Sequence, residues 1–118
     1  MVTEEINKTI VSECNEWCAT VASYTEKIND LRKRLYLFAP GKILREDLLG
    51  IEHFHNQIHI QLINIHDLNH EIRNQIKEAE RYPRIGHRIE HHNLKDKLDL
   101  LITDLDRLPE EFQQFIRN

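Results

Sequence analysis

Apolar residues recur every three or four positions along three long stretches of the chain, and this spacing predicts amphipathic helices. The first stretch repeats with alternating steps of 4 and 3 residues, a heptad pattern. Its members are Ile10, Cys14, Trp17, Val21, Tyr24, Ile28, Leu31 and Leu35. Pro40 disfavours helix at Ala39, and Gly41 permits a turn. We therefore expect a first helix over about residues 3–38.

The second stretch keeps the same rhythm and includes two polar residues, His55 and Asn69. Its members are Leu44, Leu48, Ile51, His55, Ile58, Leu62, Ile65, Asn69, Ile72, Ile76 and Ala79. It predicts a helix over about residues 43–81, which Tyr82-Pro83 and Gly86 end. Gly50 falls on the outer face of this helix, where it is expected to cost about 1 kcal/mol relative to Ala.

The third stretch is interrupted by Pro109. Its members are His87, His91, Leu94, Leu98, Leu101, Leu105, Leu108, Phe112 and Phe115. Proline is favoured in the first position of a helix, so we expect one helix over about residues 86–107 and a short C-terminal helix over residues 109–117. A kink at Pro109 is the alternative.

The connections between these helices are short, so neighbouring helices should run antiparallel. The fold class predicted is all-α: an up-down-up bundle of three long helices with a short C-terminal helix and coiled-coil-like packing, in one domain over residues 1–118. In two antiparallel helices, residues at the same level have numbers with a constant sum. We expect this sum to be about 81 for the first and second helices and about 166 for the second and third. Phe54 then lies near Phe112, and Leu44 and Leu48 join the heaviest apolar layer.

Composition and charge exclude several classes of protein. No apolar run approaches the roughly 20 residues of a membrane span, and residues 1–10 lack the apolar block of a signal peptide. We therefore expect a cytoplasmic protein with no membrane partner. The formal net charge of -4 argues against nucleic acid as a partner.

All 8 histidines lie between residues 53 and 92, and three pairs are four residues apart: His55/His59, His66/His70 and His87/His91. This spacing stacks two imidazoles on one helix face, close enough to share a metal ion. The expected levels bring Cys14 and Cys18 beside His66 and His70. Two thiolates and two imidazoles suit tetrahedral zinc, which is one alternative for this cluster.

A second metal alternative starts from Glu52-x-x-His55, the carboxylate–histidine step of di-iron four-helix bundles, which a dimer would repeat. Structural roles compete with both metal sites. His55 and Asn69 resemble the polar seam residues that fix register in coiled coils, and a seam histidine that gains charge near pH 6 would sense pH. We favour a structural role without a cofactor, with zinc or iron as the alternative.

Neither cysteine lies at a helix start or beside a cluster of cations, and a continuous helix offers no oxyanion hole, so no enzyme is expected. Some of the apolar residues outside the primary seams should widen the buried stripe, and the remainder suggest a second apolar face. These residues are Ile60, Ile63, Leu68, Ile89, Leu100 and Ile102. We interpret the chain as a non-enzymatic helical interaction or scaffold protein. It would form a homodimer or dock a partner helix, and a metal-binding bundle is the alternative.

Overall fold

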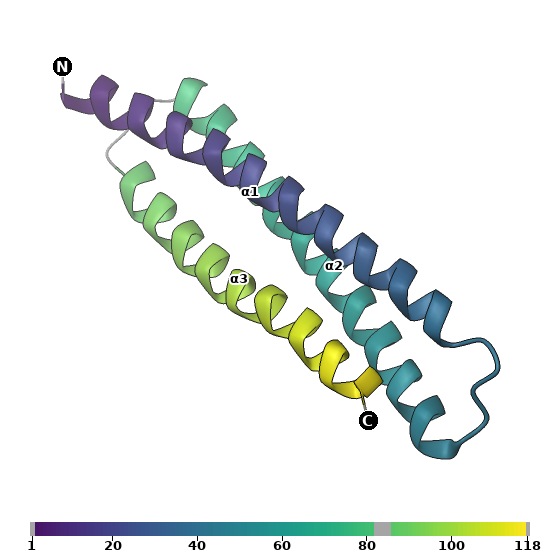
Figure 1. Cartoon of the computed structure of the whole chain (residues 1–118). Coiled ribbons are helices and arrows are strands. Elements are labelled where there is room, and N and C mark those ends of the chain that lie inside the picture. Colours follow the sequence, from purple (N-terminus) through teal and green to yellow (C-terminus); the bar gives the residue numbers. More distant parts are fainter. Residues whose placement is uncertain (1, 82–85, 118) are drawn as a thin grey trace.

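The computed structural model describes residues 2–81 and 86–117, and these form three α-helices that lie side by side as a bundle (Figure 1). The helices are α1 (Val2–Phe38), α2 (Arg45–Arg81) and α3 (His87–Arg117). Together they make a rod with Cα extents of 64 × 17 × 16 Å. The described part of the chain contains no strand. The residues Tyr82 and Pro83, expected to end the second helix, lie outside it.

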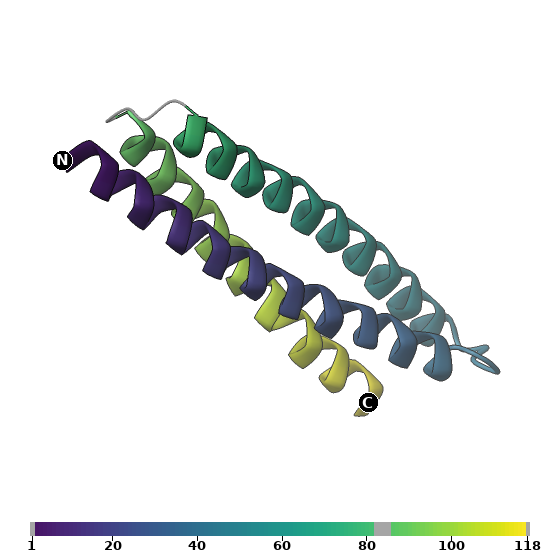
Figure 2. The ribbon, with the colours of Figure 1, turned by 90° about the horizontal axis from the view of Figure 1, so that it is seen from above.

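Contacts between side chains define how the helices lie against one another. Cys14, in the first half of α1, contacts both Gln75 of α2 and His91 of α3. Toward the other end of α1, Tyr36 contacts His55 of α2. Residue numbers therefore fall along α2 as they rise along α1. Figure 1 and Figure 2 show the three helices along one common axis, with α3 running in the direction of α1.

The relative level of α1 and α2 differs from the expected one. Opposed residues sum to 89 for Cys14 and Gln75 and to 91 for Tyr36 and His55, not to 81. The expectation was wrong because the ends of α1 and α2 are not level: the first turns of α2 extend past the end of α1. The level expected for α2 and α3 is confirmed, since Gln75 and His91 sum to 166.

The buried stripe of α2 differs in half of its members from the stripe expected. It consists of Phe54, Ile58, Gln61, Ile65, Leu68, Ile72, Gln75 and Ala79. His55 is exposed and Asn69 is half-buried, so neither is a buried seam residue. Leu62 and Ile76 instead pack on the flank of the core. Apolar side chains occupy two adjacent faces of α2, and the sequence pattern did not show which face is central.

The stripes of α1 and α3 agree closely with the pattern. In α1 all members are buried except Trp17 and Tyr24, which are half-buried, and Asn7 extends the stripe by one step. In α3 the buried residues are His87, Leu94, Leu98, Leu101, Leu105, Leu108 and Phe112. The heptad spacing thus placed most of the core correctly.

Helix α3 continues through Pro109, so the expected separate helix over residues 109–117 was wrong. Proline inside a helix removes one hydrogen bond and costs about 3 kcal/mol. Leu108 and Phe112 are 4% and 1% exposed and remain in phase with the apolar stripe on the other side of the proline. Burial of these two large side chains, about 1.5–3 kcal/mol each, offsets the cost.

An aromatic layer closes the bundle where α3 ends. The Phe54 ring lies 5.4 Å from that of Phe112, as the sequence predicted, and 5.3 Å from that of Phe115. The Phe115 ring occupies the space beside Gly50, where a Cβ atom would lie 2.1 Å from Cε1 of the ring. Gly50 therefore faces α3 and not an open outer surface. Leu44, expected in this layer, is exposed, because it precedes α2 and the first turns of α2 extend past the layer.

Candidate functional site

The structure does not bring the expected zinc ligands together. Cys14 is buried beside Gln75, whereas His66 and His70 are exposed on α2 and Cys18 is half-buried. The error in the level of α1 against α2 explains the difference, because it moves Cys14 about two turns along α2. Within residues 5–81 and 86–117, no group of three or more His, Cys, Asp or Glu side chains is arranged to hold a metal ion.

The alternative iron ligands, Glu52 and His55, are both exposed on α2. The His55 ring lies against Tyr36, with 6.4 Å between the ring centroids. In the part of the chain whose side chains are described, no third His, Cys, Asp or Glu joins this pair to hold a metal ion, so an iron site shared by two copies stays a prediction.

A buried polar cluster joins all three helices near the start of α3, and Gln75 is its centre. Gln75 is 5% exposed, and its Nε2 donates a hydrogen bond to the backbone oxygen of His87 at 3.2 Å. Its Oε1 faces the Cys14 thiol at 3.6 Å and His91 Nδ1 at 3.2 Å. The sequence did not predict this cluster, because a glutamine outside the apolar pattern of a helix is expected at the surface.

His91 links the same cluster to the surface of α1. Its Nε2 lies 3.0 Å from Glu13 Oε2, and its side chain is only 13% exposed. The Trp17 indole stacks on the imidazole, with ring centroids 4.3 Å apart and an interplanar angle of 11°. The His91 ring is therefore held from α1 and α2 at once.

Cys14, His91 and Glu13 have the order of a thiol, a base and an orienting carboxylate. Their environment prevents nucleophilic chemistry. Burial, followed by the nearby Cys18 and Glu13, raises the pKa of Cys14 to about 12, so the thiol stays protonated at neutral pH. Its side chain is also fully buried, which closes it to a substrate. The cluster is therefore a structural feature, not a catalytic one.

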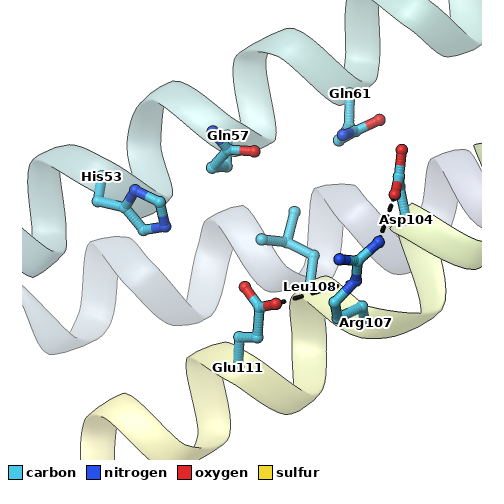
Figure 3. A pocket seen from close by; sticks show the side chains of 7 residues that line it. All are labelled: His53, Gln57, Gln61, Asp104, Arg107, Leu108 and Glu111. Atoms are coloured by element: carbon cyan, nitrogen blue, oxygen red, sulfur yellow. Dashed lines mark hydrogen bonds and ion pairs between the residues drawn. The ribbon is translucent and has the colours of Figure 1, made fainter.

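A polar groove of about 260 Å³ runs between α2 and α3 (Figure 3). Its lining residues are His53, Gln57, Gln61, Asp104, Arg107, Leu108 and Glu111. Arg107 donates to Asp104 at 2.6 Å and lies 4.0 Å from Glu111, so its charge is already compensated. The groove thus presents satisfied ion pairs to solvent and does not converge on a ligand.

The connection between α1 and α2 presents large aliphatic side chains to solvent. Five of them, here called the apolar end, are 49–85% exposed: Leu37, Ile43, Leu44, Leu48 and Leu49. They flank, along the chain, the turn between α1 and α2, and this turn projects past the C-terminal end of α3 in Figure 1. The sequence had assigned Leu44 and Leu48 to the core, which is why it did not predict this surface.

The six apolar residues outside the expected seams separate into two groups. Ile60, Ile63, Ile89 and Leu100 are exposed, at 46–71%. Leu68 is only 6% exposed and belongs to the core, and Ile102 is half-buried against it. These two residues widen the buried stripe, because the stripe of α2 is rotated and α3 buries a wider face than its primary seam.

No family model matches this chain, and the searches among curated proteins and among solved structures gave no match. None of the helices in the described ranges combines the length and apolar character needed to cross a membrane.

Proposed function

We propose that this protein is a non-enzymatic helical interaction protein that self-associates through the apolar end. The observation that carries this proposal is the group of five aliphatic side chains exposed at one end of the rod. Isolated apolar residues on a surface are ordinary, whereas contiguous exposed patches mark interaction sites. The two free cysteines, which stay reduced in the cytoplasm, fit the cytoplasmic location that belongs to this proposal.

The exposed area fits a weak dimer. Burying a whole Leu or Ile side chain removes roughly 60–120 Å² of apolar surface, since it contributes about 1.5–3 kcal/mol at about 25 cal/mol per Å². The apolar end therefore offers roughly 200–400 Å² per copy. Two copies with their polar rims would bury on the order of 1,000 Å² in total, the lower end of specific interfaces.

The charges beside the apolar end favour a second copy of the same chain as the occupant. Lys42 and Arg45 lie within five residues of Glu46 and Asp47, and the four charges cancel. A two-fold interface places each residue against a different residue of the other copy, so cations can face carboxylates in both directions. Such a surface is complementary to itself.

The experiment is sedimentation equilibrium or light scattering from about 10 µM to about 1 mM, where weak interfaces associate. The wild-type chain should shift toward the mass of a dimer as concentration rises. Replacement of Leu44 and Leu48 together by Ser should abolish the shift. Both side chains are exposed, so the monomer should keep its helical content.

The matched control replaces Ile60 and Ile63 by Ser, because these residues lie on α2 like Leu48 and are 46% and 47% exposed, close to the 49% of Leu48. This variant should associate like the wild-type chain. A wild-type chain that stays monomeric over the whole range would refute the proposal. Loss of association in the control but not in the Leu44/Leu48 variant would do the same.

A further inference from the structure

The hydrogen-bonding directions around His91 are fixed by Gln75. The backbone oxygen of His87 can only accept a hydrogen bond, so the Gln75 amide must direct Nε2 toward it. Gln75 Oε1 then points to His91 Nδ1, 3.2 Å away. A carbonyl oxygen also only accepts, so this contact is satisfied when Nδ1 carries a proton.

The other ring nitrogen of His91 faces a second acceptor. Glu13 Oε2 lies 3.0 Å from Nε2, and a carboxylate bonds well only to an N–H. A neutral imidazole has one N–H, whereas an imidazolium has two. Only the doubly protonated ring can donate to Glu13 and Gln75 at the same time. In the neutral ring one of the two contacts becomes a contact between two acceptors.

When the His91 ring is neutral, the Cys14 thiol cannot donate to both His91 Nδ1 and Gln75 Oε1. Its Sγ lies 3.7 Å from His91 Nδ1, so in the neutral ring it can donate there, but it then no longer donates to Gln75 Oε1. Because Gln75 is 5% exposed, its oxygen would be left buried and poorly paired. An unpaired buried acceptor costs roughly 1–3 kcal/mol.

The charged groups near His91 on α1 favour a positive ring. Glu5 and Glu13 line the same surface groove as His91. The Trp17 ring stacks on the imidazole, and an aromatic face attracts a cation. The three neighbours on α1, Glu5, Glu13 and Trp17, thus all favour a positive His91 ring.

The charged groups around His91 on the other two helices do not all favour a positive ring. On α3, Arg88 lines the same groove and opposes a positive ring, while His87 lies one turn before His91 with its Nδ1 3.4 Å from Glu90. On α2 the facing residue is the uncharged Gln75. Two carboxylates therefore face one guanidinium around the groove, and the direct contact is to a carboxylate.

We infer that His91 is a proton-dependent clamp, which ties α3 to α1 and α2 when its ring carries two protons and loses one of these ties when it carries one. This inference does not depend on self-association, since the clamp is built within one chain. It predicts that the contact between the three helices near the start of α3 loosens as pH rises.

Trp17 reports on this clamp, because it is the only tryptophan of the chain and stacks on His91. A protonated imidazole in contact with an indole quenches its fluorescence. A titration from pH 5 to pH 9 should therefore show weaker Trp17 emission at low pH and a single transition. His91→Gln should remove the transition. His66→Gln, at an exposed histidine, should leave it unchanged.

Glu13→Gln provides a second test that does not remove the ring. It should keep the transition but move its midpoint to lower pH, because a favourable charge is lost. Glu13 is 44% exposed, so the fold should tolerate this change. A flat emission profile in the wild-type chain, or the same transition in His91→Gln, would overturn the inference. An unchanged midpoint in Glu13→Gln would overturn it as well.

Discussion

Replacing Gly50 by Ala should destabilise the bundle, although the change improves helix propensity. Gly50 lies inside α2, and alanine in a helix interior is favoured over glycine by about 1 kcal/mol. The added Cβ would lie 2.1 Å from Cε1 and 2.3 Å from Cζ of Phe115. No real contact is that short, so the ring must leave its place.

The displaced ring determines the magnitude. The Phe115 ring pairs with those of Phe54 at 5.3 Å and Phe38 at 5.4 Å, and each pair contributes about 0.5–1.5 kcal/mol. Forced repacking adds about 1–3 kcal/mol. After the gain in propensity, we expect Gly50→Ala to lower the free energy of unfolding by about 2 kcal/mol. For a chain of this length the melting temperature should fall by about 8 °C.

The assay is a double-mutant cycle by urea denaturation with Phe115→Ala. Once the ring is absent, Gly50→Ala should raise the free energy of unfolding by about 1 kcal/mol, because only the propensity remains. The change of sign is the decisive feature. Stabilisation by Gly50→Ala in the wild-type chain, or equal destabilisation in both backgrounds, would refute the reasoning.

Two further predictions concern buried polar groups. Burial raises the pKa of Cys14 from 9.0 to about 12, so above pH 9 the unfolded chain loses a proton that the folded chain keeps. The free energy of unfolding keeps its full value below pH 9 and should decline by about 1 kcal/mol per pH unit between pH 9 and pH 12. Urea denaturation at pH 8 and pH 10.5 tests this prediction. Cys14→Ala should reduce the decline. Asn7 is 6% exposed, and among the described residues neither atom of its amide group has a hydrogen-bond partner. Asn7→Leu should raise the free energy of unfolding by about 1–3 kcal/mol, and a decrease would contradict this account.

The sequence predicted the fold class and most of the core because α1 and α3 confine their apolar residues to one stripe. In α2 the apolar residues cover two adjacent faces, so Leu62 and Ile76 were preferred to Gln61 and Gln75, which the structure buries. Apolar periodicity cannot identify a buried glutamine, since its burial depends on partners in other helices. Here those partners are supplied by α1 and α3.

The candidate site was harder to predict than the core, because it depends on relative levels. A shift of α2 by about two turns against α1 separates Cys14 from His66 and brings it to Gln75 and His91. The same shift exposes Leu44, so one error about the level of α2 against α1 accounts for both the missing zinc site and the unexpected apolar end. Pairs of residues within one helix are fixed by local geometry, whereas pairs across helices depend on the connection.

The contact between α1 and α2 also bears on the order in which the helices associate. α1 and α2 share a more extensive contact than α3 makes with either helix. Both connections are short, so the extent of the contact decides the order: the α1–α2 hairpin should assemble first and α3 should dock last. By the same argument α3 is the cooperative unit that detaches most readily, and its amides should exchange with solvent before those of the hairpin. A detached α3 leaves a seam that the α3 of another copy fits equally well, so refolding at high concentration should yield exchanged dimers.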